Sequence, residues 1–161
     1  MANIESRLSA LGLKLPPAFT PPPGVVFPFV NVRLIGNRAV IAGHGPQSTE
    51  GPLARPLGKV GSELTIEQGY TAAKLTALSM LGNLKRALGD LDRITQWVRI
   101  FGMVNSAPDF IQQPAIINGC SDLILELWGP EAGAHARSAV GMAELPFGMP
   151  VEIEGEVVIS A

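Results

Sequence analysis

One arginine and three glutamates near the end of the chain are the residues best suited to carry chemistry. Arg137 stands at the start of a mostly apolar stretch, and Glu152, Glu154 and Glu156 alternate with other residues further along. A guanidinium matches a carboxylate bidentately and stays charged at any relevant pH, so the arginine suits a small acid. A surface ion pair with a nearby glutamate would account for it equally well. The glutamates are either a solvated sheet edge or include one that meets a partner or a water in a cleft.

Other common catalytic arrangements are missing from the sequence. There is no dinucleotide-binding, Walker or nucleophile-elbow motif. His44 and His135 lack metal-ligand spacing, so we predict no metal and no cofactor. Cys120, the only cysteine, excludes an intrachain disulfide, and we expect it to lie inside a helix rather than act as a nucleophile. A loop histidine such as His44 is either structural or solvated, or it transfers protons.

Composition limits the partners of this 161-residue chain, which is long enough for one domain with a real core. Apolar residues make up 47% and charged residues only 16%, below the ~25% usual for soluble proteins. We therefore expect the surplus apolar surface to meet another subunit, since no apolar run is long enough for a membrane. The formal net charge is −2, and no basic block favours nucleic acid. The single cysteine and the lack of a signal peptide favour a cytoplasmic protein.

The first part of the chain divides at residue 27. Helical spacing predicts a short helix over residues 3–12, and a proline-rich arm follows that we expect to lie on the body. We predict that residues 1–27 form this helix and arm and that residues 28–161 form the main domain. Two strands, 29–34 and 38–42, are joined by a glycine–asparagine turn.

A long Gly/Pro loop over residues 44–62 precedes the first long helix, and such loops are often functional. Thr65 and Gln68 form a capping box, which predicts a helix that runs to about Leu88 and stops at Gly89. Its predicted buried stripe is Ala73, Ala77, Leu81, Leu84 and Leu88.

The second half of the chain predicts a strand, a helix and two more strands. The first strand covers 94–104, and Asp109 is the expected cap of a helix that runs to about Leu127. Residues 135–156 have the pattern of a strand, a tight turn and a second strand.

The predicted order is β-β-α-β-α-β-β, an α+β fold with both long helices on one face of a mixed sheet. The other face would carry Val, Ile and Ala, which cannot remain in water because burial contributes ~25 cal/mol per Å². Association of several copies would cover it.

Two segments resemble a known family. ARSAVGMAELPFGMPVEIE, residues 136–154, resembles the C-terminal signature of the RidA/YjgF family of reactive-intermediate (enamine/imine) deaminases, also described as endoribonuclease L-PSP-like proteins. PFVNVRLIGNRAVIAGHGP, residues 28–46, resembles the N-terminal hairpin of that family. The resemblance covers about 28–158, and the additional N-terminal segment and long loop resemble a divergent YjgF/chorismate-mutase-like branch. It implies a chorismate-mutase-like fold and a homotrimer with the sheets inside, the helices outside and clefts between subunits.

The resemblance also implies roles for particular residues. Arg137 would bind the carboxylate of a 2-imino or 2-enamino acid, and Glu152 would position the attacking water. Asn118 and Gly43 would complete the substrate site.

Three positions depart from the family pattern. Phe29 stands where the deaminases have tyrosine, Ala42 replaces a serine, and Ala139 replaces a cysteine. The resemblance implies that this last position acts through its backbone carbonyl, which alanine retains. The resulting pocket would be more apolar, and His44 could replace part of the lost polarity.

Three functions remain at this point. The first is hydrolytic deamination of small 2-imino or 2-enamino acids, such as those from 2-aminoacrylate, to 2-oxo acids and ammonia. The second is a non-catalytic trimer that binds or senses a small carboxylate metabolite, and Glu152 is the residue that separates the two. An endoribonuclease is third and has the least support, because the chain is acidic and has no histidine pair suited to it.

Overall fold

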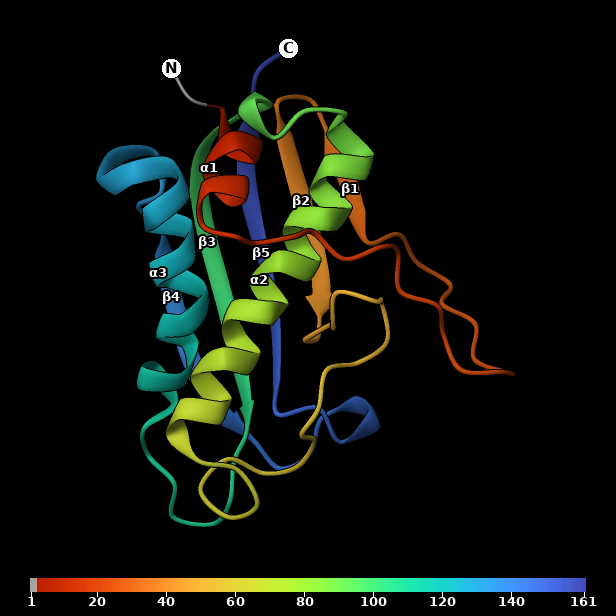
Figure 1. Ribbon diagram of the computed structural model, residues 1–161, viewed down its shortest axis with the longest axis vertical. Coiled ribbons are helices and arrows are strands. Elements are labelled where there is room, and N and C mark those ends of the chain that lie inside the picture. The colour runs from red at the N-terminus through yellow and green to blue at the C-terminus, as the bar shows by residue number, and fades with distance from the viewer. Residues whose placement is uncertain (1–2) are drawn as a thin grey trace.

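The computed structural model describes residues 3–161, which form one mixed β-sheet with helices on one of its faces (Figure 1). The strands are β1 (Val32–Ile35), β2 (Arg38–His44), β3 (Ile94–Asn105), β4 (Ala136–Met142) and β5 (Val151–Ile159). Their order across the sheet is β1-β2-β5-β3-β4, with β3 and β4 parallel and the other neighbours antiparallel. The α-helices are α1 (Ile4–Ala10), α2 (Ile66–Leu88) and α3 (Gln113–Ala132). The predicted α+β class, element order and placement of the helices are confirmed.

Helix α2 begins and ends where the sequence predicts. The Thr65 hydroxyl accepts the backbone N–H of Gln68 at 3.1 Å, and the Gln68 side chain accepts the backbone N–H of Thr65 at 2.9 Å. This reciprocal pair satisfies two N–H groups that have no partner inside the helix. Gly89 follows the last turn with φ at +81°, a left-handed conformation that favours glycine. The predicted stripe is buried throughout: Ala73, Ala77, Leu81, Leu84 and Leu88.

Helix α3 starts later than predicted, because Asp109 is not its cap. Asp109 has φ at +64° and lies in the preceding loop, whereas the helix starts at Gln113 with Pro114 in its first turn. Proline suits this position, since the first-turn N–H groups have no helical acceptor. The regular helix breaks at Gly129, close to the predicted end, and Pro130 follows.

Helices α2 and α3 approach closely at Gly119. A Cβ placed there would lie 2.0 Å from the backbone oxygen of Tyr70. Only a glycine allows the two backbones this separation. Beside the contact, the Tyr70 hydroxyl donates to Asp122 at 2.7 Å and ties the same two helices together.

The predicted tight turn between the last two strands is wrong. Strand β4 pairs in parallel with β3 at the sheet edge, while β5 runs antiparallel between β2 and β3. A tight turn joins neighbouring antiparallel strands, so it cannot link these two. Residues 143–150 make the connection instead, with a 3₁₀ turn at Pro146–Gly148.

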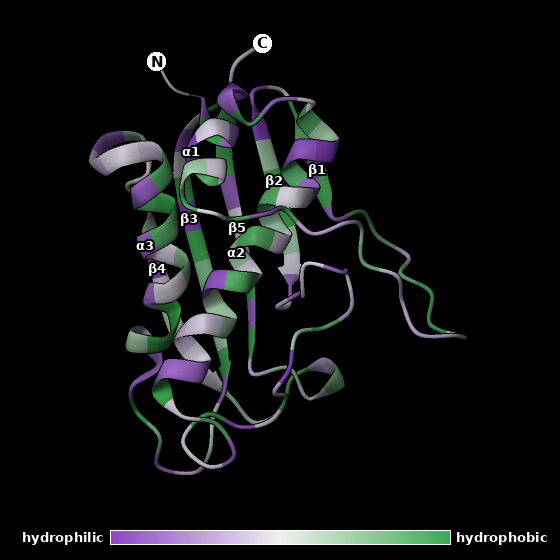
Figure 2. Ribbon diagram, in the orientation of Figure 1, coloured by the Kyte–Doolittle hydropathy of each residue, from purple (hydrophilic) through white to green (hydrophobic). Residues whose placement is uncertain are grey.

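The face of the sheet opposite the helices is partly apolar. Val40 is 42% exposed and Val140 37%, and Phe101 and Met103 between them are half-buried. Hydrophobic residues therefore occur along the strands as well as on the helices (Figure 2). Surface of this kind is suited to contact with another protein surface.

The proline-rich arm between α1 and β1 lies on the body only at its base. The Pro16 carbonyl accepts from Arg86 of α2 at 3.1 Å, and the Pro17 carbonyl accepts from Gln47 at 3.2 Å. Beyond these contacts the arm projects away from the body and returns to β1 (Figure 1). Val26 near its tip is 82% exposed, so the prediction that the whole arm lies on the body is wrong.

Candidate active site

The three glutamates of β5 have different surroundings on the sheet face that the helices leave uncovered. Glu156 forms an ion pair with Arg38 of β2, and Glu154 lies 3.9 Å from Arg99 of β3. Within residues 3–161, Glu152 has no ion pair. It is half-buried, and burial, with a smaller effect of the Glu154 charge, raises the pKa of its carboxyl group. Because no arginine engages it within the described residues, Glu152 is the carboxylate of the three that is best placed to accept a proton from a ligand or a water.

Glu152 lines a cavity of about 270 Å³ at the end of the sheet where β2 ends, β5 starts and the arm joins β1. The cavity brings together residues of the arm, β2, the following loop, α2, the 143–150 connection and β5. They are Phe19, Phe27, Phe29, Asn31, Gly43, His44, Gly45, Gln47, Leu53, Asn83, Pro146, Phe147, Met149 and Glu152. The lining is mostly apolar with a few polar groups, as is common in small-molecule sites. The structure thus places the predicted residues Phe29, Gly43, His44 and Glu152 in one site.

Gly43 leaves room for the Glu152 carboxylate. A Cβ at residue 43 would lie 2.5 Å from Glu152 Oε1 and 3.0 Å from its Cδ. Any larger residue would force the carboxylate to move. The glycine therefore allows the Glu152 carboxylate to occupy the position seen in the structure.

His44 is held as a neutral structural residue. It is 7% exposed, its Nδ1 lies 2.5 Å from the Ala42 carbonyl, and its Nε2 lies 2.8 Å from Asn83 Nδ2. A carbonyl only accepts, so Nδ1 carries the proton and Nε2 accepts from the amide. Burial lowers the pKa of His44, and the charge of Arg86 adds to this effect. Both ring nitrogens are occupied, which favours the structural interpretation of His44 over proton transfer.

Arg137 lies against α3 at the opposite edge of the sheet. Its Nη1 donates to Asn118 Oδ1 at 2.8 Å and to Ser121 Oγ at 3.1 Å, and its Nη2 donates to the Pro114 carbonyl at 3.4 Å. No ion pair holds it within residues 3–161, so the ion-pair interpretation of this residue has no support there. Because a guanidinium has five N–H donors, the Nε and Nη2 side of the fork remains available for a carboxylate.

The predicted site residues therefore form two groups within one chain. Arg137 pairs with Ile100 of β3 and faces the helices, while Glu152 pairs with Met103 of β3 and faces the uncovered side. Asn118 lies beside Arg137, and Ala139 is on the same edge strand. Strand β3 separates the two groups, so one chain does not bring Arg137 and Glu152 to the same ligand.

Several lining residues have no counterpart in the prediction. Asn83 interrupts the apolar stripe of α2 and lies in the cavity, where it contacts His44. A single polar residue among buried leucines was the signal that could have identified it. Phe19 and Phe27 belong to the arm, and Phe147 has φ at +59° in the 143–150 connection. No local pattern indicates that these three rings reach the cavity.

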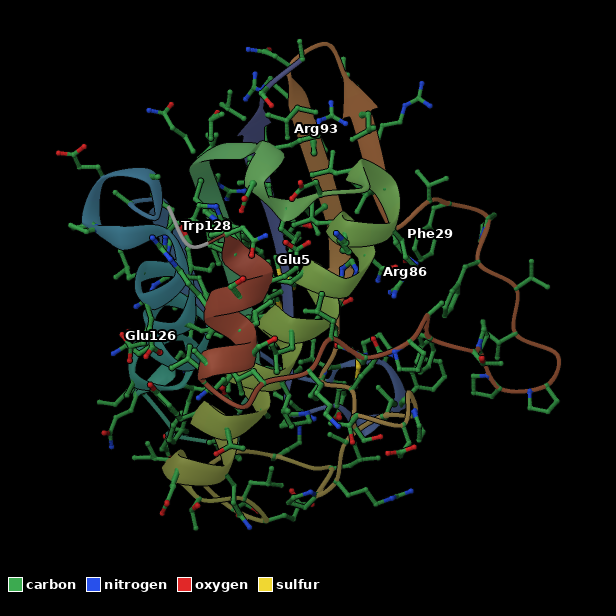
Figure 3. The ribbon with its side chains drawn as sticks, turned by 45° about the horizontal axis from the view of Figure 1, so that its top comes forward. Glu5, Phe29, Arg86, Arg93, Glu126 and Trp128 are labelled. Carbon is green, nitrogen blue, oxygen red and sulfur yellow. The ribbon has the colours of Figure 1, made fainter. Side chains whose placement is uncertain are left out.

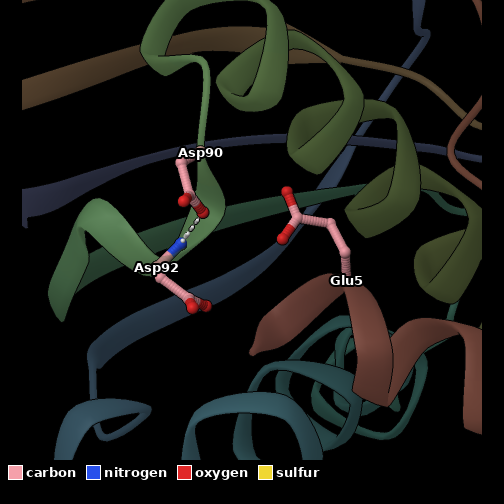
Figure 4. A group of neighbouring side chains, drawn as sticks. All are labelled: Glu5, Asp90 and Asp92. Atoms are coloured by element: carbon pink, nitrogen blue, oxygen red, sulfur yellow. Dashed lines mark hydrogen bonds between the residues drawn. The ribbon is translucent and has the colours of Figure 1, made fainter. Parts of the chain in front are cut away.

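Two other groups with reactive side chains are structural. Cys120 is fully buried in α3, and burial raises the pKa of its thiol to about 12, so it is no thiolate nucleophile. Glu5, Asp90 and Asp92 gather near the start of α1 (Figure 4). Their oxygens are used within the protein: Glu5 pairs with Lys85, Asp92 accepts the backbone N–H of Ile4 at 2.7 Å, and Asp90 accepts that of Asp92 at 2.9 Å.

None of the helices in residues 3–161 has both the length and the apolar character needed to cross a membrane.

Comparison with known proteins gives close and distant relatives. Residues 5–151 match the family model described as "YjgF/chorismate mutase-like, putative endoribonuclease". Protein TCP17 of Trypanosoma cruzi is 39% identical over 155 residues, which cover 96% of this chain and 93% of that protein. The structure of Atu1372 from Agrobacterium tumefaciens is 39% identical, with a TM-score of 0.87 over 98% of this chain and 92% of that one. A structure from Shewanella oneidensis described as a "putative endoribonuclease" is 31% identical, with a TM-score of 0.88 over 98% and 100% of the two chains.

The fold extends to more distant structures. Escherichia coli TdcF with bound serine is 20% identical, with a TM-score of 0.58 over 86% of this chain and 93% of that one. RidA from Psychrobacter is also 20% identical, with a TM-score of 0.56 over 85% and 93%. At this identity the likeness establishes the fold alone.

Proposed function

The chain belongs to the YjgF/chorismate mutase-like family, and from this premise we propose that it hydrolyses 2-imino and 2-enamino acids to 2-oxo acids and ammonia. One observation carries the proposal. Glu152 is a half-buried carboxylate that no cation pairs with in the part of the chain that the structure describes, and it lines a mostly apolar cavity of about 270 Å³. Such a group can take a proton from water and deliver it to a leaving nitrogen.

The reaction requires little from the protein beyond positioning. Glu152 takes a proton from a water whose oxygen bonds to the imine carbon as the C=N π bond breaks, and it passes this proton to the nitrogen. In the resulting carbinolamine Glu152 moves the hydroxyl proton to the amino group, and ammonia leaves as the C–N bond breaks and the C=O bond forms. Water and the imino acid supply all the atoms, so no cofactor is needed. Holding the water and the imine together provides the acceleration.

We further propose that the substrate carboxylate is held by Arg137 of a neighbouring copy. Within one chain Arg137 and Glu152 face opposite sides of the sheet, whereas an intersubunit cleft can bring the two together. Three copies joined through the uncovered sheet face would bury Val40 and Val140, in the homotrimer that the family resemblance implies. Light scattering at micromolar concentration tests this proposal. The expected mass is three times that of the 16.9 kDa chain, and the mass of one chain would contradict it.

The ligand class has independent support from a protein of the same fold. The TdcF structure contains serine, an amino acid with a free carboxylate. The endoribonuclease in the family description has less physical support, because a formal net charge of −2 provides little attraction for a phosphate backbone.

Ammonia release from 2-aminoacrylate generated in situ tests the proposal. We expect the wild type to accelerate release over buffer and Glu152→Gln to reduce the rate by about 10²-fold or more, since general bases contribute about 10²–10⁴-fold. Glu154→Gln on the same strand face is the matched control and should keep the activity. If the wild type binds 2-oxo acids without accelerating ammonia release, the protein is a non-catalytic binder and the proposal is wrong.

A further inference from the structure

The three phenylalanines of the arm form one aromatic wall. Phe19 lies on the outgoing limb and Phe27 on the returning limb, with ring centroids 6.2 Å apart and planes 15° apart. Phe27 stacks in turn on Phe29, with centroids 5.2 Å apart and planes 27° apart. The limbs meet at a turn in which the backbone N–H of Val25 donates to the Pro22 carbonyl at 3.0 Å. The stack therefore connects the outgoing and returning limbs of the arm.

The base of the arm is fixed to the body, which sets where this aromatic wall stands. Gln47 is buried and donates both to the Pro17 carbonyl at 3.2 Å and to the Gly51 carbonyl at 2.7 Å. Arg86 donates to the Pro16 carbonyl at 3.1 Å and to Asn83 at 3.0 Å. Figure 3 labels Arg86 on α2 and Phe29 where the returning limb joins the body.

The aromatic wall and the Glu152 carboxylate line the same cavity. Phe147 and Met149 of the 143–150 connection lie in its lining as well, while Glu152 and Asn83 supply polar groups. Phe29 is still 55% exposed, and Phe19 and Phe27 are half-buried, so the rings retain apolar surface that a ligand can cover. A 2-imino carbon placed at Glu152 would leave its substituent beside these rings.

We infer that the enzyme prefers 2-imino acids with an aromatic or branched aliphatic side chain over those with a small side chain. This inference rests on the proposed function and names its substrate class. The arm phenylalanines are the specificity residues: they contact the substituent, whereas Glu152 acts at the reacting carbon. A volume of about 270 Å³ suits a single ring or a branched alkyl group.

Kinetics with matched imines test the preference. An amino-acid oxidase with catalase generates the imines of phenylalanine, leucine and alanine, and hydrolysis competes with trapping by semicarbazide. We expect kcat/KM to be at least about tenfold higher for the phenylalanine and leucine imines than for the alanine imine. Phe27→Ala should lower kcat/KM for the two large imines about tenfold more than kcat/KM for the alanine imine.

Two control variants and a binding measurement test whether the Phe27 ring itself causes the preference for large substrates. Val26→Ala changes a neighbouring arm residue that is 82% exposed and should leave the preference unchanged. Phe27→Tyr keeps the ring and should keep the preference. Calorimetry compares phenylpyruvate with pyruvate, and the wild type but not Phe27→Ala should bind phenylpyruvate more tightly.

The outcomes distinguish this inference from the proposed function. If the alanine imine is hydrolysed as fast as the large imines and the two 2-oxo acids bind equally, the inference is wrong and the hydrolase proposal stands. If no imine is hydrolysed but phenylpyruvate binds more tightly through Phe27, the hydrolase proposal fails and the preference of the pocket stands. If Phe27→Ala changes only the oligomeric mass, the aromatic wall serves an interface between copies and the inference is wrong.

Discussion

Replacing Arg137 by alanine should remove the proposed hydrogen bonds to the substrate carboxylate while leaving the fold intact. Three guanidinium N–H groups are used on Asn118, Ser121 and Pro114, and the Nε and Nη2 side remains for the ligand. Hydrogen bonds to charged groups contribute ~1.5–3 kcal/mol, and each ~1.4 kcal/mol is a factor of ten. We therefore expect Arg137→Ala to bind 2-oxo acids about 10- to 150-fold more weakly.

The fold should survive because the groups that Arg137 leaves behind find other partners. Asn118 and Pro114 are exposed, so water replaces the guanidinium. Ser121 keeps its contact with His135 Nε2 at 2.9 Å. We expect the free energy of unfolding to fall by less than about 1 kcal/mol.

Calorimetry on folded protein provides the assay for Arg137. Arg137→Lys should recover part of the affinity, because an ammonium group is a point charge and cannot reproduce the planar fork. Arg33→Ala changes an exposed arginine on β1, at the other edge of the sheet, and should bind as the wild type does. Binding by Arg137→Ala that equals the wild type would refute the assignment of this residue.

Three further substitutions test other parts of the account. Gly119→Ala places a methyl group 2.0 Å from the Tyr70 backbone oxygen, so urea unfolding should show a loss of roughly 1–3 kcal/mol; unchanged stability would contradict the close helix contact. Gly43→Ala should displace the Glu152 carboxylate and lower kcat for imine hydrolysis about 10- to 100-fold at nearly constant melting temperature; full activity would contradict the positioning role. The folded-state pKa of Glu152 lies above its unfolded value, so its ionisation destabilises the fold as pH rises through the folded-state pKa. Glu152→Gln should therefore melt at a higher temperature than the wild type at pH 8 and lose this advantage below about pH 4.3; the same difference at every pH would count against the buried charge.

The sequence predicted both ends of α2, because each end is set by residues that are close together in the chain. The capping box at Thr65 and the stop at Gly89 use contacts within a few residues, so their chemistry can be read directly. Asp109 has the composition of a cap, but Pro114 in the first turn of α3 sets the start of the helix instead. Residue type alone does not make a cap, because the side chain must also reach a backbone N–H of the first turn.

The sequence did not predict which strands lie next to β4 and β5 in the sheet. The apolar alternation of β5 predicts a strand and its buried face, and Val151, Ile153, Val157 and Ile159 are buried as expected. The same alternation is compatible with a hairpin to β4, which the structure replaces by parallel pairing with β3. Pairing is decided by the whole sheet, because crossover connections and not local pattern place parallel strands together.

The sequence also did not predict how the candidate site is assembled. Family resemblance made Glu152 a candidate, but its difference from Glu154 and Glu156 depends on arginines supplied by β2 and β3. The aromatic wall depends on an arm that turns back on itself, which brings Phe19 to Phe27. Both features arise from contacts between residues far apart in the sequence, and the spacing of residues along the chain does not predict such contacts.

A mixed oligomer tests most directly whether Arg137 and Glu152 of different copies build one active site. Chains with Arg137→Ala or Glu152→Gln are each expected to hydrolyse imines far more slowly than the wild type. The two chains are co-expressed, purified as mixed oligomers and assayed at a substrate concentration well below KM. Random assembly pairs an intact Arg137 with an intact Glu152 at roughly one in four interfaces, so the mixture should recover about a quarter of wild-type activity. The shared site would be contradicted if the mixed oligomers hydrolyse imines no faster than either variant alone. Mass spectrometry first shows that these oligomers contain both chains.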